Sequence, residues 1–459
     1  MTDRTDALAE ARDFFDAHPE VDAVDMIFTN MGGVPRGKRL RQHEALAVYE
    51  NGRFLPISVT FADITGRDVE ETGLLWETGD ADCLCLPVPG TLVAAPWGGA
   101  GAAQFITSFH ELDGRPHDLD PRAVLAKVIN RLKEIGLTPD IAVELEFYLL
   151  ERRFGRDGKP RPARAGGQHR SDIQVYGLTE LEDQRPFLDD LYAFADAQGI
   201  PLESAISEYA AGQFELTLEH KPDAIRACDE AVMYKRIVKE AARLHGLEAT
   251  FMAKPFADSA GNGMHLHMSL VDESGANAFA SDDPEGSPLL RHAIGGMQAL
   301  LADSFALFAP NANSYRRFRA NSYAPVAPTW GVNNRTVSFR VPAGAPKTRH
   351  VEHRVCGADA NPYLAVAAVL AAMHHGIVNK LDPGPAIVGN GYEQASASSA
   401  APMPANWFAA VDRFAQSAVL RDYLGSRFVD VFATVKRSEQ DRYFAEVPSQ
   451  DYDWYLRTA

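Results

Sequence analysis

The chain contains 459 residues, of which 46% are hydrophobic and 23% are charged, a composition typical of a soluble globular protein with room for two or three domains. Its net charge of −17 argues against nucleic acid or an anionic membrane as the main partner. The four cysteines fit a reducing compartment better than a disulfide framework, and the acidic N-terminus has no signal-peptide core. We therefore expect a cytoplasmic protein with no nucleic-acid or membrane partner.

A glycine-rich stretch divides the chain into two parts. Residues up to about 90 combine one helix with short strand-like runs, and "VPGTLVAAPWGGAGAA" is typical of a connection. Long amphipathic helices follow at 121–135, 185–198 and 222–244, with proline near their starts and glycine beyond their ends. Polar-faced strands lie between these helices. The pattern predicts the α+β class, with one domain over 1–105 and another over 106–459.

Two further features complete the outline of the chain. The longest apolar run begins at Ala365, is too short to span a membrane, and predicts a buried alanine-rich helix. The segments 152–172 and 389–404 are rich in small and polar residues, and we expect solvated, mobile loops there.

The stretch "DIAVELEFYLL" places two carboxylates on one face of a predicted strand. Apolar residues alternate with Glu144 and Glu146, so the two acids lie about 7 Å apart on the polar face. Neither acid has a lysine or arginine two residues away to relieve the repulsion. Three interpretations compete: a solvated edge strand, an acid/base pair of the glycosidase kind, or a metal site.

Later stretches supply more polar-faced strands. "SEYAAGQFELTL" contributes two acids, "GNGMHLHMSL" sets histidines and a serine on one face, and "VEHRVCGADANPYL" adds an acid and an arginine two residues apart. "YRRF" and "NNRTVSFRVP" add three arginines. The side chains that these stretches contribute are Glu208, Glu215, His265, His267, Ser269, Glu352, Arg354, Arg317, Arg335 and Arg340.

This set favours the metal interpretation. Carboxylates with one histidine suit hard ions such as Mg²⁺ or Mn²⁺ better than zinc, which prefers several histidine or cysteine ligands. Two such ions beside arginines would clamp a polyphosphate, whereas a glycosidase pair requires no arginine set. "RGKRL" lacks the spacing of a phosphate-binding loop, and no G-x-G-x-x-G follows a strand. We expect ATP to be held by metal ions and arginines.

At these residues the chain resembles the glutamine synthetase superfamily over nearly its whole length. The motifs that carry the resemblance occur in order: "RGKRL", "SVTFADITG", "VELEFYLLER", "AGQFEL", "ATFMAKPF", "GNGMHLHMSL", "PNANSYRRF", "WGVNNRTVSFRVP" and "ADANPYLAVAAV". The resemblance implies a small N-terminal β-grasp domain and a large catalytic domain with a curved antiparallel sheet flanked by helices. It also implies a homo-oligomer, a dodecamer of two stacked hexamers, with each active site between neighbouring subunits.

The resemblance also implies roles for individual residues. The reaction would be phosphorylation of the glutamate γ-carboxylate by ATP, followed by attack of an amine on γ-glutamyl phosphate, with two to three Mg²⁺ or Mn²⁺ ions per site. One ion near glutamate would be held by Glu146, Glu208 and Glu215, and one on the nucleotide phosphates by Glu144, His265 and Glu352. His267 and Ser269 would face ATP. Gly261, Arg317 and Arg354 would place glutamate, and Arg335 and Arg340 would stabilise the transferring phosphoryl group.

The acceptor site departs from that of ammonia-using members. Those enzymes carry a glutamate in the loop after the arginine motif, where this chain has Tyr323, and an asparagine where it has Ala260. A tyrosine is neutral at pH 7 and offers an apolar ring face, which suits the methylenes of an alkylamine. Asp63 aligns with an acceptor-site aspartate contributed by a neighbouring subunit. His350 replaces an arginine, for which Arg349 is an alternative contact to ATP.

These departures most resemble γ-glutamylputrescine and γ-glutamylpolyamine synthetases. Enzymes that glutamylate methylamine, ethylamine or isopropylamine are the nearest alternatives, and a true glutamine synthetase using ammonia is a further one. A non-catalytic structural or sensing homologue is a fourth alternative, against which the retention of all six metal positions argues. The sequence leaves the amine, the choice of metal, the ring size and any feedback regulation open.

Overall fold

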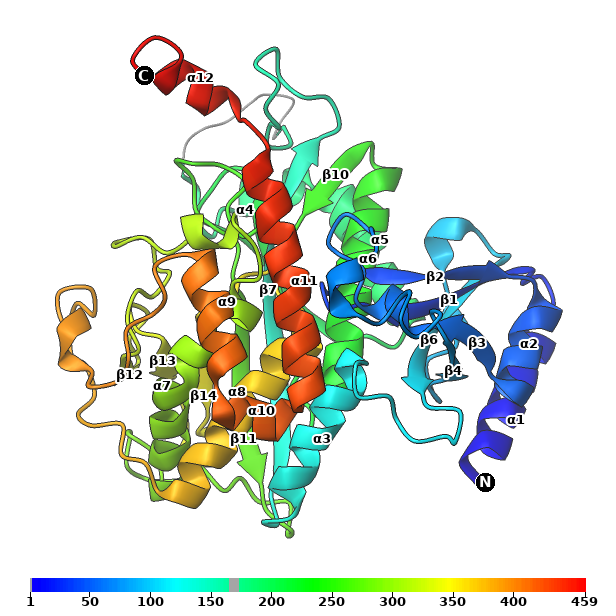
Figure 1. Cartoon of the computed structure of the whole chain (residues 1–459), viewed down its shortest axis with the longest axis horizontal. Helices are drawn as coiled ribbons and strands as arrows, with labels where there is room; N and C mark the ends of the chain where they lie inside the picture. The colour runs from blue at the N-terminus through cyan, green and yellow to red at the C-terminus, as the bar shows by residue number, and fades with distance from the viewer. Residues whose placement is uncertain (1, 165–172) are drawn as a thin grey trace.

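The computed structural model describes residues 2–164 and 173–459, which form two parts, each built around its own sheet (Figure 1). The N-terminal sheet has six strands in the order β2-β1-β6-β4-β3, with β5 paired to β6. Strand β1 runs parallel to β6, and the other pairs are antiparallel. Its strands are β1 (Ala23–Thr29), β2 (Pro35–Leu40), β3 (Arg53–Pro56), β4 (Asp82–Pro87), β5 (Val93–Ala94) and β6 (Ala102–His110). Helices α1 (Thr2–Ala17) and α2 (Gln42–Asn51) contact each other beside this sheet.

The glycine-rich stretch is part of the N-terminal sheet rather than a connection between domains. β5 lies within it and pairs with β6 around a short 3₁₀ turn (Pro96–Gly98). Gly99 follows that turn with a φ of +83°, a conformation that glycine adopts without strain. β6 then runs on to His110, so the predicted division between residues 105 and 106 falls inside this strand. The division into two domains at that point stays a prediction.

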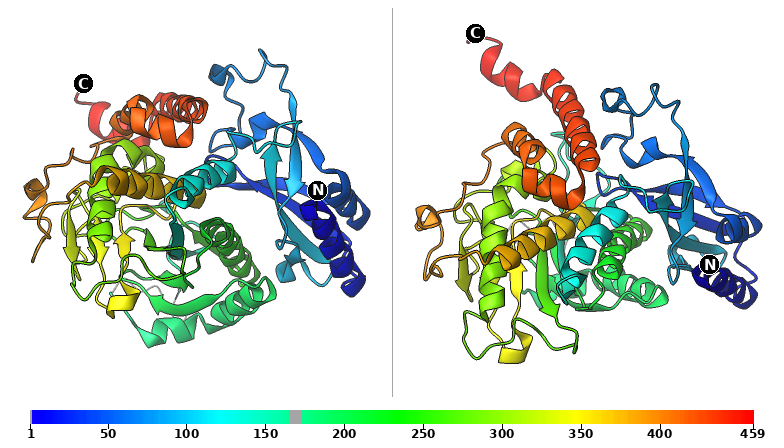
Figure 2. Two further views of the ribbon diagram at one scale, coloured as in Figure 1. Left: turned by 90° about the horizontal axis from the view of Figure 1, so that it is seen from below. Right: turned by 60° about the horizontal axis from the view of Figure 1, so that its bottom comes forward.

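The second sheet has eight strands in the order β12-β13-β14-β11-β7-β9-β8, with β10 paired to the far end of β7. All its pairs are antiparallel except β12 and β13, which are parallel and depart from the predicted antiparallel pattern. In Figure 2 the helices of this part lie around the sheet. The strands are β7 (Thr138–Glu151), β8 (Leu202–Ser207), β9 (Gln213–Leu218), β10 (Leu247–Thr250), β11 (Met264–Val271), β12 (Trp330–Val332), β13 (Phe339–Val341) and β14 (Val351–His353).

The helices of the second part confirm the predicted pattern closely. The predicted helix at 222–244 begins two residues later, because the side chain of Asp223 accepts a hydrogen bond from Arg226 N and caps the first turn. The helices are α3 (Pro121–Lys133), α4 (Leu178–Asp183), α5 (Arg185–Ala197), α6 (Ala224–Leu244), α7 (Pro288–Phe308), α8 (Pro362–Asn379), α9 (Trp407–Gln416), α10 (Ala418–Leu424), α11 (Ser426–Ala445) and α12 (Ser449–Tyr455).

Helix α8 contains the apolar run that begins at Ala365. By length and composition this helix could cross a membrane, but 78% of its 18 residues are buried inside the protein. It packs against α7 and α3, as a core helix does. The first predicted loop, 152–172, is described only as far as residue 164, and the rest of it lies outside the described residues. The second predicted loop, 389–404, contains one short 3₁₀ turn (Ala395–Ala397).

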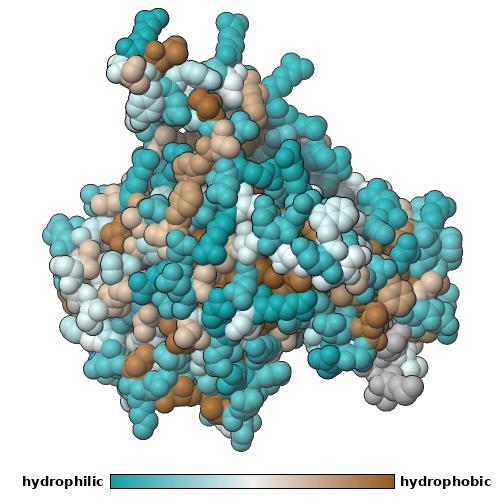
Figure 3. Space-filling view, viewed as in Figure 1, coloured by the Kyte–Doolittle hydropathy of each residue, from teal (hydrophilic) through white to brown (hydrophobic). Residues whose placement is uncertain are grey.

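The face shown in Figure 3 is mostly hydrophilic, and apolar side chains are scattered over it. The C-terminal end, with α12, projects from the body of the protein in Figure 1. This end carries several exposed apolar side chains, among them Phe444, Val447, Trp454 and Leu456. Such a cluster is typical of a surface that contacts another protein chain.

Two glycines allow α7 and α8 to approach closely. A Cβ on Gly296 would lie 2.0 Å from Ala372 O, and one on Gly376 would lie 2.1 Å from His292 O. We expect Gly296→Ala to lower the free energy of unfolding by about 1–3 kcal/mol, because the two helices would have to move apart to make room for the methyl group. Urea unfolding measures this loss. Ala299→Ser, at an exposed position of the same helix, should leave stability unchanged, and an equal effect of both variants would contradict the close-packing account.

Candidate active site

Strand register brings the predicted acids and histidines together on one face of the second sheet. Glu144 on β7 lies opposite His265 on β11, and Glu146 lies opposite Glu215 on β9. On the other side of β11, His267 lies opposite Glu352 on β14. Directly opposed residues of antiparallel strands point to the same face, so four strands contribute side chains to one site.

One group of potential ligand atoms contains Glu144, His265 and Glu352. One atom from each lies within 4.8 Å of the others, and His265 Nδ1 is 2.6 Å from Glu144 Oε1. Glu352 is buried and also receives Arg340 Nη1 at 2.8 Å and an ion pair from Arg354. The structure thus assembles these three side chains as the resemblance implied.

A second group contains Glu146, Glu215 and again His265, with ligand atoms within 4.8 Å of one another. Glu208 was predicted in this group. It lies in the loop between β8 and β9, close enough for its charge to act on Glu146, while its carboxylate accepts a hydrogen bond from Tyr209 N. The described structure therefore places Glu208 beside the second group rather than within its tightest set.

The two groups differ in charge balance. Burial would raise the pKa of Glu352, but Arg354 and His265 hold it at about 2. Hydrogen bonds from His265 and His267 likewise outweigh burial and lower the pKa of Glu144. In contrast, burial and Glu208 raise the pKa of Glu146 to about 7, and burial with the neighbouring carboxylates raises the pKa of Glu215. In the second group, burial and repulsion between carboxylates outweigh the nearby arginine charge, which is the property expected of a site for a divalent cation.

This charge balance predicts proton release when a divalent cation binds. Raised pKa values mean that the metal-free protein retains protons at neutral pH that ordinary carboxylates have lost, and only the ionised form binds a metal. We expect Mg²⁺ or Mn²⁺ binding at about pH 7 to release protons, and affinity to rise as pH increases from about 6 to about 8. Calorimetric titrations in two buffers of different ionisation enthalpy measure the number released. Identical heats in both buffers would contradict the prediction.

Arg317 and the glycine stretch before β11 pack closely together. Arg317 is buried, donates from Nη1 to Val355 O at 2.8 Å, and acts through its charge on Glu146. A Cβ on Gly261 would lie 2.9 Å from Arg317 Cγ, and one on Gly263 would lie 2.7 Å from Arg317 Nη2. Gly263 N also donates to Glu146 Oε2 at 2.6 Å. The glycines are therefore needed for the arginine to reach the second group.

The remaining predicted arginines approach the site from β13, β14 and the segment before β13. Arg354 is buried and pairs with Glu352. Arg340 bridges Glu352 and Asn333 Oδ1, the second at 3.1 Å. Arg335 is exposed, and its charge offsets part of the rise in the pKa of Glu208 that burial causes. The arginine set thus surrounds both carboxylate groups.

The loop that carries Tyr323 contacts Tyr209, the residue after Glu208. Tyr323 is 55% exposed and adopts a φ of +57°, an unusual conformation for a bulky residue and often a sign of a functional position. Its ring lies 6.3 Å from the ring of Tyr209, edge to face. Ala260 O accepts a hydrogen bond from Tyr148 at 2.8 Å. Tyr323 therefore packs against the residue that follows Glu208.

Asp63 is buried in the N-terminal part. Its carboxylate accepts hydrogen bonds from Thr65 and Arg67 N and pairs with Arg442 of α11. The contacts within one chain therefore hold the loop against α11. The predicted role of Asp63 concerns a neighbouring subunit, and it stays a prediction.

The amino-acid sequence of this chain matches the model of a known protein family. The family model described as "Glutamine synthetase, catalytic domain" matches residues 118–455. The chain belongs to the glutamine synthetase family.

Individual relatives and solved structures are similar to this glutamine synthetase family member over almost its whole length. Gamma-glutamylputrescine synthetase of Escherichia coli (strain K12) is 39% identical over 452 residues, which cover 98% of this chain and 95% of that protein. Glutamate–isopropylamine ligase of a Pseudomonas species is 33% identical, covering 94% and 93%. The structure titled "GmaS/ADP complex-Conformation 1" superimposes with a TM-score of 0.83 at 28% identity, covering 98% of this chain and 99% of that one.

Enzymes of the glutamine synthetase family use ATP and a divalent metal, and the donor set here fits such an ion. Three residues near this set were assigned no role from the sequence: Tyr209, Gly263, which donates through its backbone N–H, and Gln213, whose Nε2 donates to Gly261 O at 3.1 Å. Gly263 and Gln213 lie within motifs that carried the resemblance, so their position was a usable signal. Tyr209 gave none, because only the folded loop brings it to Tyr323.

Proposed function

We propose that this protein ligates the γ-carboxylate of L-glutamate to an organic amine, with ATP converted to ADP and phosphate and γ-glutamyl phosphate as the intermediate. The observation that carries the proposal is the pairing of two carboxylate groups with an arginine set, together with a tyrosine, Tyr323, where ammonia-using members carry a glutamate. The names of the relatives support it, since they describe ligation of putrescine or isopropylamine to a γ-glutamyl group or glutamate.

Each active site would hold two to three divalent ions, either Mg²⁺ or Mn²⁺. The two groups of side chains that share His265 would bind them. Glu146, Glu208 and Glu215 would hold the ion near glutamate, and Glu144, His265 and Glu352 the ion near the nucleotide. Such ions would neutralise the phosphate oxygens and the charge that develops during phosphoryl transfer.

The chain's own residues would bind and orient the reactants. Arg317, Arg354 and Gly261 place glutamate, so that a γ-carboxylate oxygen attacks the γ-phosphorus of ATP and ADP leaves. Arg335 and Arg340 stabilise the equatorial oxygens of the transferring group. His267 and Ser269 face ATP from β11, and either His350 or Arg349 contacts it near β14. Phosphorylation is chemically necessary, because an unmodified carboxylate would have to expel oxide.

The amine then attacks the acyl carbon, phosphate leaves, and the attacking nitrogen loses a proton. The rings of Tyr323 and Tyr209 offer apolar faces to the methylenes of the amine. Asp63 of a neighbouring subunit would bind the amine as its counter-charge. This role requires a homo-oligomer, for which a dodecamer of two stacked hexamers is proposed, and the exposed apolar C-terminal end supports association. We propose two domains that divide close to the predicted 105/106 boundary, near the end of β6, and we place the protein in the cytoplasm.

The test is ADP release by purified protein with glutamate, ATP and Mg²⁺, with ammonia, methylamine, ethylamine, putrescine and spermidine offered separately. We expect a diamine or alkylamine to exceed ammonia in kcat/KM by at least about 100-fold. If ammonia is the preferred acceptor, the protein is a glutamine synthetase in the strict sense. If no amine stimulates ADP release, the ligase proposal is wrong.

A further inference from the structure

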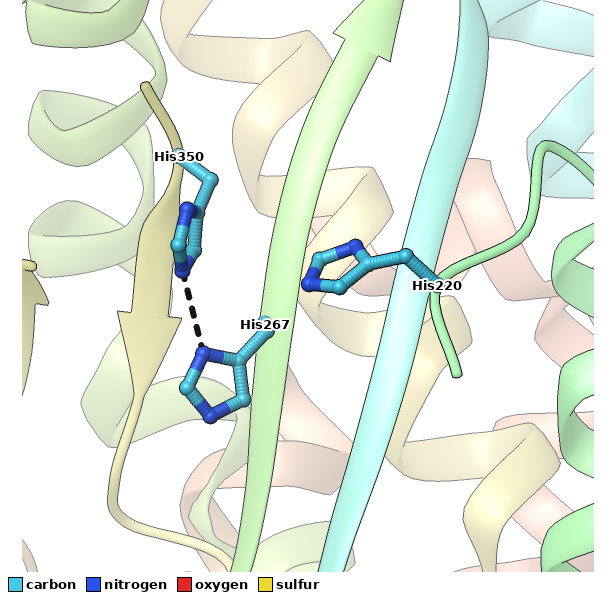
Figure 4. Close-up of side chains that lie close together, drawn as sticks. All are labelled: His220, His267 and His350. Atoms are coloured by element: carbon cyan, nitrogen blue, oxygen red, sulfur yellow. Dashed lines mark hydrogen bonds between the residues drawn. The ribbon is translucent and has the colours of Figure 1, made fainter. Parts of the chain in front are cut away.

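Three histidines from separate segments meet at one edge of the site. Figure 4 shows His267 on β11, His350 just before β14 and His220 just after β9, with their rings turned toward one another. One ring nitrogen of each lies within 4.8 Å of one ring nitrogen of the others. Sequence pattern does not predict this cluster, because the three residues are far apart in the chain and only His267 belongs to an alternating motif.

Hydrogen bonds fix which nitrogens of two of these rings are free. His350 Nδ1 lies 2.9 Å from Thr348 O, and since a carbonyl only accepts, Nδ1 must carry the proton and Nε2 the lone pair. His267 Nε2 lies 3.4 Å from Glu144 Oε2 and donates to it, so in the neutral ring Nδ1 carries the lone pair. These two lone-pair nitrogens face each other at 3.1 Å. Figure 4 marks this contact as a hydrogen bond, which needs a proton on His267 Nδ1; a metal ion bound to both nitrogens is the other way to join the two rings.

The 3.1 Å spacing matches that of two ligands on one metal ion. Two imidazole nitrogens bound tetrahedrally to zinc at their usual bond length lie about 3.3 Å apart. A proton joins only these two rings, whereas a metal ion would engage a third ring as well. His220 supplies that third ring, because mutual backbone hydrogen bonds at 3.0 Å between Lys221 and Ile141 hold its segment against β7.

The surroundings resemble those of metal-bound histidines. A ligating imidazole usually donates its second N–H to a carbonyl or a carboxylate, as His350 does to Thr348 and His267 to Glu144. His220 Nδ1 lies 3.9 Å from Asp140 Oδ1, an atom that is buried and, among the described residues, has no hydrogen-bond partner. His220 is exposed, so the cluster is open to solvent and can accept water as a fourth ligand.

We propose that His220, His267 and His350 form a binding site for a divalent transition-metal ion of the zinc class, distinct from the carboxylate groups that suit Mg²⁺ or Mn²⁺. Nitrogen-rich sets favour Zn²⁺ or Co²⁺, whereas oxygen-rich sets favour the harder ions, so the two kinds of site select different metals. A second consequence rests on the proposed function: an ion held by His267 occupies a residue assigned to ATP, so Zn²⁺ weakens nucleotide binding.

The test uses untagged, full-length, metal-free protein with saturating Mg²⁺ and no nucleotide, titrated with Co²⁺ and followed by visible absorption. We expect one tight site per chain with the intense bands of tetrahedral Co²⁺, which Zn²⁺ displaces. His220→Ala should weaken this site by about 100-fold or more, because a direct ligand is lost, and Asp140→Asn by about tenfold, because the carboxylate charge 3.9 Å from His220 Nδ1 is lost. His43→Ala, at an exposed position of α2, should have no effect.

Absence of a tetrahedral Co²⁺ spectrum in the wild-type protein would overturn the proposal, as would an unchanged affinity in folded His220→Ala. Circular dichroism checks that this variant is folded. Calorimetric binding of Mg²⁺·ADP with and without Zn²⁺ tests the second consequence separately. If the Co²⁺ spectrum appears but the protein ligates no amine, the metal site stands and the proposed function fails.

Discussion

Glu215→Gln is expected to abolish most ligase activity while making the metal-free protein more stable. Glu215 is buried opposite Glu146, and burial with the neighbouring carboxylates raises its pKa. Its removal relieves repulsion that the folded protein otherwise carries, but it also removes a proposed metal ligand. We expect kcat for amine-dependent ADP release to fall by about 100-fold to 1,000-fold, and Mn²⁺ affinity by at least about tenfold.

Two measurements separate these effects. Thermal unfolding in EDTA should give a higher Tm for Glu215→Gln than for the wild type, and Mn²⁺ should raise the Tm of the variant less than that of the wild type. Glu219→Gln changes an exposed acid four residues along the chain and should match the wild type in both measurements. A Glu215→Gln variant with wild-type activity and Mn²⁺ affinity would show that Glu215 holds no essential ion.

Tyr323→Glu is expected to shift the acceptor preference from organic amines toward ammonia. The substitution replaces an apolar ring face beside Tyr209 with a carboxylate, which attracts ammonium and repels the methylenes of a longer amine. We expect kcat/KM for the preferred amine to fall by at least about tenfold, and that for ammonia to rise. Steady-state rates with both acceptors, at saturating ATP and glutamate, measure the shift.

Tyr323→Phe is the matched control, because it keeps the ring and removes only the hydroxyl. If the ring face binds the methylenes, this variant should retain the amine preference of the wild type. The KM for glutamate should remain similar in both variants, which excludes a general collapse of the loop. Equal loss of all acceptors in Tyr323→Glu, with ammonia no better than before, would contradict the assigned role of this residue.

Alternation along single strands predicted much of the site. Because strand side chains alternate between faces, "VELEFYLL" and "GNGMHLHMSL" already separated the polar faces of β7 and β11 from the core. Which acid meets which histidine depends on the register between strands, and the pairing of Glu144 with His265 is visible only in the fold. The family motifs supplied that pairing before the structure did.

Features that depend on long-range contacts escaped the sequence. The stretch before β6 looked like a connection because it is rich in glycine, yet β5 within it pairs with β6. Tyr209 and His220 lie in or beside turns without a repeating pattern, so their neighbours Tyr323 and His350 could not be inferred from spacing. Local pattern predicts which face a side chain occupies, whereas its partner across the fold depends on tertiary packing.

The central claim is that glutamate is activated by phosphorylation and then transferred to an organic amine. Its most direct test supplies glutamate labelled with ¹⁸O in the γ-carboxylate, together with ATP, Mg²⁺ and putrescine, and analyses the products by mass spectrometry. The account predicts a γ-glutamyl amide of the amine and one ¹⁸O atom transferred to each inorganic phosphate. Amide formation without transfer of ¹⁸O to phosphate, or ATP cleavage without any γ-glutamyl amide, would contradict it.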